Sequence, residues 1–137
     1  MRKEEVPDPP PGLRAVDPRE WTRVWARVLA EPSVKLTGFA LLTWADYRTG
    51  AEIRPGAPLL MRVTGIGSRT TIAKALEQIR DWGLIWRYLE GSKAPFYFAD
   101  DGTRKRPPDE YRLTFPDDSR AIPMMSPDWK LPGEACG

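Results

Sequence analysis

The fold is decided between Ala57 and Ile85, where the chain reads APLLMRVTGIGSRTTIAKALEQIRDWGLI. Its first eight residues place leucine and valine at helical spacing, and the glycines on either side of Ile66 predict a tight turn after them. Ser68 follows as a good N-cap for a second, longer helix, which Gly83 ends. The stretch therefore predicts a short helix, a tight turn and a longer helix, in that order.

The longer helix has one apolar and one polar face. Its apolar residues recur at helical spacing, which predicts that they anchor the helix on the rest of the domain; they are Ile72, Ala75, Leu76 and Ile79. The opposite face is left in solvent and consists of Arg69, Thr70, Ala73, Lys74, Glu77 and Gln78. Arginine, lysine and glutamine side chains have the reach and the hydrogen-bond donors to read base edges in the major groove of B-DNA. This helix-turn-helix arrangement thus predicts DNA recognition.

Two strand-like runs follow the longer helix. Alternating and aromatic residues predict strands over 84–89 and 110–115, and the long polar loop between them contains a run at 94–98 that could add a third strand. A hairpin placed directly after a helix-turn-helix is a wing. The predicted fold class is therefore α+β, a winged helix-turn-helix with three to four helices and a wing of two or three strands.

Two further helices are predicted upstream. Asp17 and Pro18 are typical of an N-cap and a first helical position. They are followed by an apolar stripe at helical spacing, formed by Trp21, Val24, Trp25, Val28 and Leu29. A second helix is predicted over 33–47, with an inward face of Leu36, Phe39, Ala40, Thr43, Trp44 and Tyr47. Trp21 and Trp25 of the first helix are predicted to lie in the core; the alternative is a homodimer interface formed by this helix.

Proline clusters mark the ends of the domain. Proline removes a backbone donor and biases its predecessor toward extended conformations. We therefore predict a flexible arm over 1–17, a folded domain over 18–115 and an acidic, largely unstructured tail over 116–137. Four apolar side chains give the tail anchors for docking on a protein partner or for folding back on the domain: Met124, Met125, Trp129 and Leu131.

Composition removes most catalytic chemistry. The 137 residues include no histidine and one cysteine, Cys136, so one chain cannot build a Ser-His or Cys-His pair, a Cys/His zinc site or a disulfide. We therefore expect no enzyme, no metal and no cofactor. No apolar run is long enough to span a bilayer, and no signal peptide is visible. A cytoplasmic protein without a membrane partner is expected.

Charge is unevenly distributed along a chain whose net charge is +2, from 21 Lys+Arg and 19 Asp+Glu. Residues 50–115 carry 11 basic and 8 acidic side chains, whereas the tail from Pro116 carries 2 and 4. The excess positive charge thus falls on the predicted helix-turn-helix and wing. A net charge of this size does not by itself indicate a nucleic-acid partner, because strongly basic domains are the usual footprint of such proteins, and the positions of the charges matter more.

The stretch over 59–85 resembles the winged helix-turn-helix domains of bacterial, plasmid and phage DNA-binding proteins. These share Thr-Gly-apolar and Ser before the recognition helix, Ala-Leu within it and Gly-Leu-Ile after it. The matching residues are Thr64, Gly65, Ile66, Ser68, Ala75, Leu76, Gly83, Leu84 and Ile85. Gly67 departs from the commonest pattern by adding a residue to the turn. The resemblance covers about 33–115 and implies double-stranded DNA binding by a transcription regulator or a replication-type initiator.

The predicted DNA-binding residues lie on both helices of the motif and on the wing. Those expected closest to the bases are Ser68, Arg69, Thr70, Thr71, Lys74 and Gln78. Phosphate contacts are expected from Arg62, Lys93, Arg104, Lys105 and Arg106. The alternative function is a protein–protein interaction module of a replication or transcription complex, without direct DNA readout.

Overall fold

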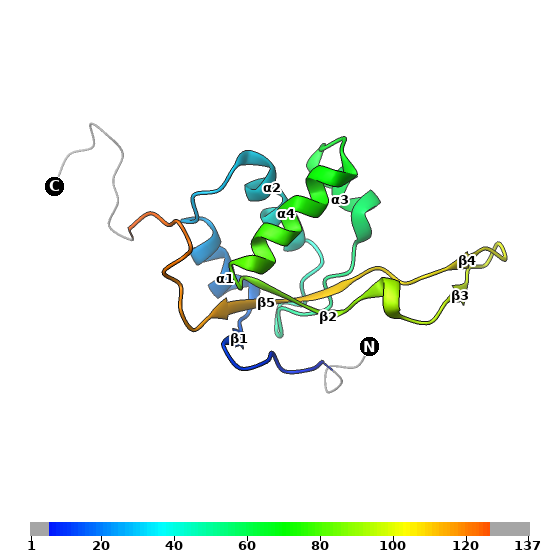
Figure 1. The fold of residues 1–137 in the computed structure, drawn as a ribbon, viewed down its shortest axis with the longest axis horizontal. Helices are drawn as coiled ribbons and strands as arrows, with labels where there is room; N and C mark the ends of the chain where they lie inside the picture. The colour runs from blue at the N-terminus through cyan, green and yellow to red at the C-terminus, as the bar shows by residue number, and fades with distance from the viewer. Residues whose placement is uncertain (1–5, 127–137) are drawn as a thin grey trace.

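Four helices and two small antiparallel sheets make up residues 6–126, the part of the chain that the computed structural model describes (Figure 1). The helices are α1 (Pro18–Trp25), α2 (Pro32–Leu41), α3 (Gly56–Thr64) and α4 (Arg69–Asp81). The strands are β1 (Leu13–Ala15), β2 (Ile85–Leu89), β3 (Tyr97–Phe98), β4 (Arg104–Lys105) and β5 (Glu110–Pro116), and a short 3₁₀ turn, η2, covers Gly91–Lys93. The fold is therefore α+β, as predicted.

The larger sheet has β5 at its centre, paired antiparallel with β1 on one side and β2 on the other. Leu13 lies opposite Pro116, and Val16 at the end of β1 is buried. The flexible arm predicted over 1–17 is therefore wrong for its final residues, because the chain after the proline cluster has free backbone donors that pair with β5. Residues 1–5 of that arm lie outside the described part of the chain.

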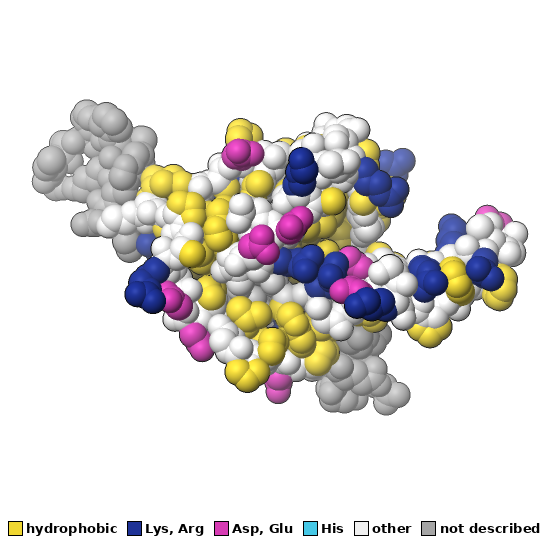
Figure 2. Space-filling model, viewed as in Figure 1, with side chains coloured by type: hydrophobic (Ala, Val, Ile, Leu, Met, Phe, Trp, Pro, Cys, Tyr) yellow, Lys and Arg dark blue, Asp and Glu magenta, His cyan; other side chains and the backbone are white. Residues whose placement is uncertain are grey.

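β3 and β4 form a separate two-stranded sheet, which lies between β2 and β5 in the sequence. The segment over 90–109, called the ribbon below, projects well beyond the body of the molecule (Figures 1 and 2). Its two arms approach closely at the base, where a Cβ on Gly91 would overlap the backbone carbonyl of Pro107. Glycine is needed here because any side chain would push the two arms apart.

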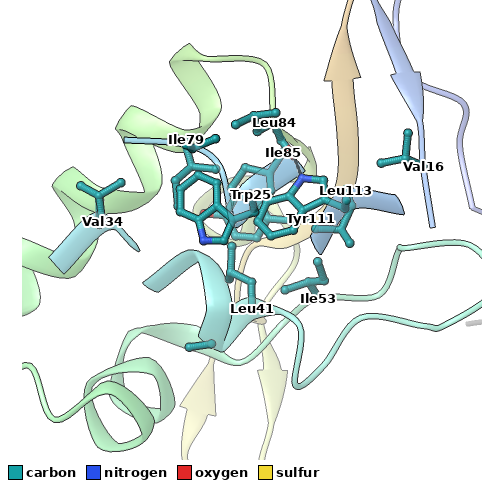
Figure 3. Close-up of a cluster of buried hydrophobic side chains, with 14 of the residues drawn as sticks. Val16, Trp25, Val34, Leu41, Ile53, Ile79, Leu84, Ile85, Tyr111 and Leu113 are labelled. Atoms are coloured by element: carbon teal, nitrogen blue, oxygen red, sulfur yellow. Dashed lines mark hydrogen bonds between the residues drawn. The ribbon is translucent and has the colours of Figure 1, made fainter. Parts of the chain in front are cut away.

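Both tryptophans of α1 belong to the buried core, and Figure 3 shows Trp25 at the centre of that cluster. The Trp21 and Trp25 rings stack with their centroids 5.2 Å apart, and both side chains are fully buried. Each indole N–H donates to a backbone carbonyl, from Trp21 Nε1 to Leu84 at 2.7 Å and from Trp25 Nε1 to Lys35 at 3.1 Å. The core assignment is confirmed. Because both indoles are enclosed within one chain, they are not available to a homodimer interface, and a homodimer through the rest of this helix stays a prediction.

α2 presents a different face to the core from the one predicted. The helix ends at Leu41, and its buried residues are Val34, Thr37, Gly38, Ala40 and Leu41. Of the predicted inward residues, Ala40 is buried and Trp44 half-buried, whereas Leu36, Phe39, Thr43 and Tyr47 are exposed. The reason is the bulk of Trp25. Gly38 of α2 packs so closely against this indole that no room is left for a Cβ. Close packing on the indole therefore outweighed the burial of the larger side chains.

The first part of the predicted tail is packed on the domain. Met124 bridges to Val28, and the backbone N–H groups of Leu29 and Met125 donate to Pro123 and Arg27 at 2.7 and 2.9 Å. Ile122 is buried. The prediction of a largely unstructured tail is therefore wrong over 116–126, where the chain folds back on the domain beside the end of α1. The other predicted anchors, Trp129 and Leu131, lie outside the described residues.

Candidate nucleic-acid interface

α4 is held in place by its caps and its apolar face. Ser68 Oγ accepts a hydrogen bond from the backbone N–H of Thr71 at 3.2 Å, so the predicted N-cap is confirmed. Gly83 has a φ of +75° directly after the last turn, the left-handed conformation that commonly ends a helix. Ile72, Ala75 and Ile79 are buried and Leu76 is half-buried, as predicted. The helix is therefore fixed from behind, and its other face is free for a partner.

The solvent face of α4 carries two cations near its beginning and two carboxylates near its end. Arg69 and Lys74 are exposed, and neither forms an ion pair or side-chain hydrogen bond with another residue of the described chain. Thr70 and Ala73 are also exposed, which leaves short side chains between the cations. Glu77 and Asp81 are exposed on the second half. The second half also carries the half-buried Arg80, so one net negative charge there stands against two positive charges on the first half, and it is the first half of α4 that attracts an anion.

A groove of about 740 Å³ lies between α4 and the base of the ribbon. Arg69 reaches it from α4, and Lys105 and Arg106 reach it from the ribbon. Its walls are largely apolar and come from residues that include Leu60, Ile72, Leu76 and Tyr111. We call it the α4–ribbon groove. It brings together cations that are more than 30 positions apart in the sequence.

A second hollow, of about 450 Å³, lies on the other side of α4. Thr71, Lys74 and Gln78 line it from α4, opposite Glu31 and Ser33 at the beginning of α2. Thr71 and Gln78 face the beginning of α2 across this hollow and are half-buried, so they are less accessible to a partner than predicted. α4 is thus a ridge between two hollows, a shape that no pattern in the sequence indicated.

The ribbon holds its cations in different ways. The guanidinium carbons of Arg104 and Arg106 each lie 3.9 Å from the centre of the Phe96 ring, a cation–π arrangement that leaves their charges uncompensated. Lys105 is exposed. Lys93, by contrast, forms an ion pair with Glu90 at 3.1 Å. Hydrogen bonding from Lys93 and the nearby Arg87 charge lower the pKa of Glu90, so the Glu90 carboxylate is charged at neutral pH and offsets part of the positive charge of Lys93.

The remaining predicted contact, Arg62, is exposed on the last turn of α3. Figure 2 shows Lys and Arg side chains on the body and along the ribbon, where they lie among hydrophobic side chains; Asp and Glu side chains lie between them on the body. The predicted residues are therefore all at the surface of the α3, α4 and ribbon region, but they do not form one uniformly basic patch.

Asp109 fixes the base of the ribbon, a role for which the sequence offered no signal. One carboxylate oxygen accepts a hydrogen bond from the backbone N–H of Gly91 at 2.7 Å, and the other pairs with Arg87 at 3.3 Å. The same oxygen lies 3.5 Å from the hydroxyl of Tyr111, whose pKa burial raises to about 12. One half-buried carboxylate thus joins β2, η2 and β5, and thereby holds the direction in which the ribbon leaves the body.

We expect Asp109→Ala to lower the free energy of unfolding by about 1–3 kcal/mol, because it leaves the buried N–H of Gly91 without an acceptor. The measurements are urea denaturation and hydrogen exchange at the Gly91 amide, which should become faster. Asp100→Ala, an exposed carboxylate in the same ribbon, is the matched control and should change neither. An unchanged exchange rate at Gly91 in the Asp109 variant would contradict this role.

No helix in residues 6–126 is both long and apolar enough to cross a membrane. The same part of the chain contains no group of three or more histidine, cysteine, aspartate or glutamate side chains placed to hold a metal ion. Comparison of the chain with models of protein families, with curated proteins and with solved structures finds no match.

Proposed function

We propose that this chain binds double-stranded DNA as a winged helix-turn-helix domain, with α4 as the recognition helix and the ribbon as the wing. One observation carries the proposal. Arg69 and Lys74 are exposed and form no ion pair within the described chain, and they lie on a helix whose opposite face is buried. An α-helix with its side chains is about 10–12 Å across, and the major groove of B-DNA is about 12 Å wide. α4 is a ridge between two hollows, and this shape supports its entry into such a groove.

The charges on α4 define how the helix would enter. Glu77 and Asp81 on the second half repel phosphates, so the first half, from Arg69 to Lys74, points toward the bases. The unpaired N–H groups at the start of α4 favour a phosphate there. In this orientation Lys105 and Arg106 face the same duplex from the other wall of the α4–ribbon groove.

The biological role that fits is a transcription regulator or a replication-type initiator. The alternative, a protein-interaction module without DNA readout, relied partly on the apolar side chains of the tail. Met124 is half-buried and bridges to Val28, which removes it as a free anchor for a partner. What supports DNA binding over this alternative is the pair of exposed cations, Arg69 and Lys74, on α4.

Selection from a pool of random duplexes, with the bound fraction measured at several salt concentrations, tests this proposal. We expect enrichment of a specific sequence and an affinity that falls with salt, because each phosphate contact releases counterions. With about four phosphate contacts, the slope of log affinity against log salt would be about −3 to −4. A pool without enrichment, together with an affinity insensitive to salt, would instead support the interaction module.

A further inference from the structure

The ribbon has two chemically different faces. Tyr97 and Lys105 are cross-strand partners, and both line the α4–ribbon groove. Phe98 and Arg104 form the next pair, and neither lines that groove. Successive residues of a strand point to opposite sides, so one face of the ribbon is turned toward α4 and the other away from it. We call the second one the outer face.

The outer face combines aromatic surface with positive charge. Phe98 is 72% exposed and Phe96 is 44% exposed. Arg104 stacks on Phe96, which orders its guanidinium group without neutralising it, whereas Arg106, which also stacks on Phe96, lines the α4–ribbon groove. Within the described residues, no carboxylate pairs with either arginine.

Phe98 is the uncovered ring of this face. Phe96 has guanidinium groups over it, whereas no aromatic ring or cation stacks on Phe98 within residues 6–126. A phenyl ring held in water on a projecting strand is unfavourable by itself, and a flat apolar partner would remove that cost. Arg104 lies opposite Phe98 across the ribbon and supplies a positive charge beside the ring.

We propose that the outer face binds an unpaired DNA strand, with a base stacked on Phe98 and the backbone near Arg104. Exposed aromatic rings flanked by arginine are the chemistry by which proteins hold single strands, because every base has a face that can stack. Paired bases are enclosed in a duplex and offer Phe98 no such face. The positive charge of Arg104 complements the phosphates of the strand.

The position of this face relates the strand to the duplex. The inner face of the ribbon borders the groove that α4 shares, so a duplex on α4 would lie along one side of the ribbon. An unpaired strand that leaves this duplex at a fork would then pass along the outer face of the ribbon. Asp100 and Asp101 at the turn repel phosphates, which keeps the backbone near Arg104 and leaves the base to Phe98. This inference rests on the proposed binding of duplex DNA by α4.

The test compares a duplex with a fork that has the same paired sequence and two unpaired arms, measured by fluorescence anisotropy with the full chain. We expect the fork to bind about tenfold more tightly, the effect of one base–aromatic stack. A 2-aminopurine placed in an unpaired arm next to the junction should be quenched on binding. Phe98→Ala should remove both the tenfold preference and the quenching, while Phe98→Trp should keep them.

Two controls separate this inference from the proposed function. Phe98 is exposed, so Phe98→Ala should keep the thermal melting curve and the affinity for the intact duplex. Equal affinity of the unchanged chain for fork and duplex would overturn the inference and leave duplex binding standing. The inference would also fail if Phe98→Ala weakened the binding of the fork and of the intact duplex by the same factor. The inference would likewise be overturned if the unchanged chain showed no preference for the fork but self-associated, and Phe98→Ala abolished that self-association. The outer face would then bind a second copy of the chain.

Failure to bind any duplex would overturn the proposed function, and a labelled single-stranded oligonucleotide would then test the outer face alone. Binding that Phe98→Ala weakens about tenfold would support a single-strand site on the ribbon. Absence of binding to that oligonucleotide would overturn it.

Discussion

Replacing Arg69 and Lys74 together by alanine is expected to lower the affinity for the selected duplex about 100-fold or more. Both side chains are exposed on the first half of α4 and unpaired within the described chain. Each good contact from such a cation to a base is worth about 1–3 kcal/mol, and every 1.4 kcal/mol is a factor of ten. Fluorescence anisotropy titrations of the double variant and of the unchanged chain, at the same salt concentration, measure the loss of affinity.

The matched control removes two positive charges from another surface. Arg19 and Arg23 are exposed on α1, so Arg19→Ala with Arg23→Ala changes the net charge by the same amount. We expect this control to weaken binding only slightly, through long-range electrostatics that salt screens. Both double variants should melt at nearly the same temperature as the unchanged chain. Equal losses of affinity in the two double variants would reject α4 as the recognition helix.

Gly38→Ala is expected to destabilise the domain by about 2 kcal/mol or more, although helix propensity predicts a gain of about 1 kcal/mol at this position. A Cβ on Gly38 would overlap the six-membered ring of Trp25. That indole has no space to withdraw, because it stacks on Trp21 and contacts Phe39 and Trp82, whose ring centroids are 6.5 Å away. Overpacking therefore outweighs propensity, and the sign of the change distinguishes the two effects.

Gly67→Ala is the matched control for this substitution. A Cβ at Gly67 would meet no atom within 4 Å, and the backbone there lies outside the left-handed region. We expect its free energy of unfolding to stay within about 0.5 kcal/mol of the original value, or to rise slightly. Chemical denaturation of both variants gives the comparison. A stabilised Gly38→Ala chain would mean that α2 does not lie against Trp25 as the structure has it.

Local signals were sufficient to predict α4 and the turn before it. Ser68 and Gly83 delimit the helix through hydrogen bonds and backbone angles that involve only near neighbours in the chain. The burial of Ile72, Ala75 and Ile79 follows from their helical spacing alone. The positions of Arg69 and Lys74 on the solvent face followed from the same spacing, so the centre of the candidate interface could be predicted.

The predictions that failed depend on contacts between distant segments. In α2 both sides are apolar enough to be buried, and the choice was made by the shape of Trp25 from another helix. The strand at Leu13–Ala15 exists because β5, about 100 residues later, offers it an edge. Met124 is likewise placed by Val28. A pattern within one segment carries no information about such partners.

The amino-acid sequence by itself determined where the helices around the turn begin and end, which face of α4 is buried, and the absence of histidine chemistry. Only the tertiary structure decided that Arg69 shares a groove with Lys105 and Arg106, that Asp109 holds the ribbon, and that Phe98 and Lys105 point to opposite sides of it. The physical reason is that capping and helical periodicity act within a few residues. Grooves and ribbon faces depend instead on how separate elements pack, and that packing is set by the volumes of the core side chains.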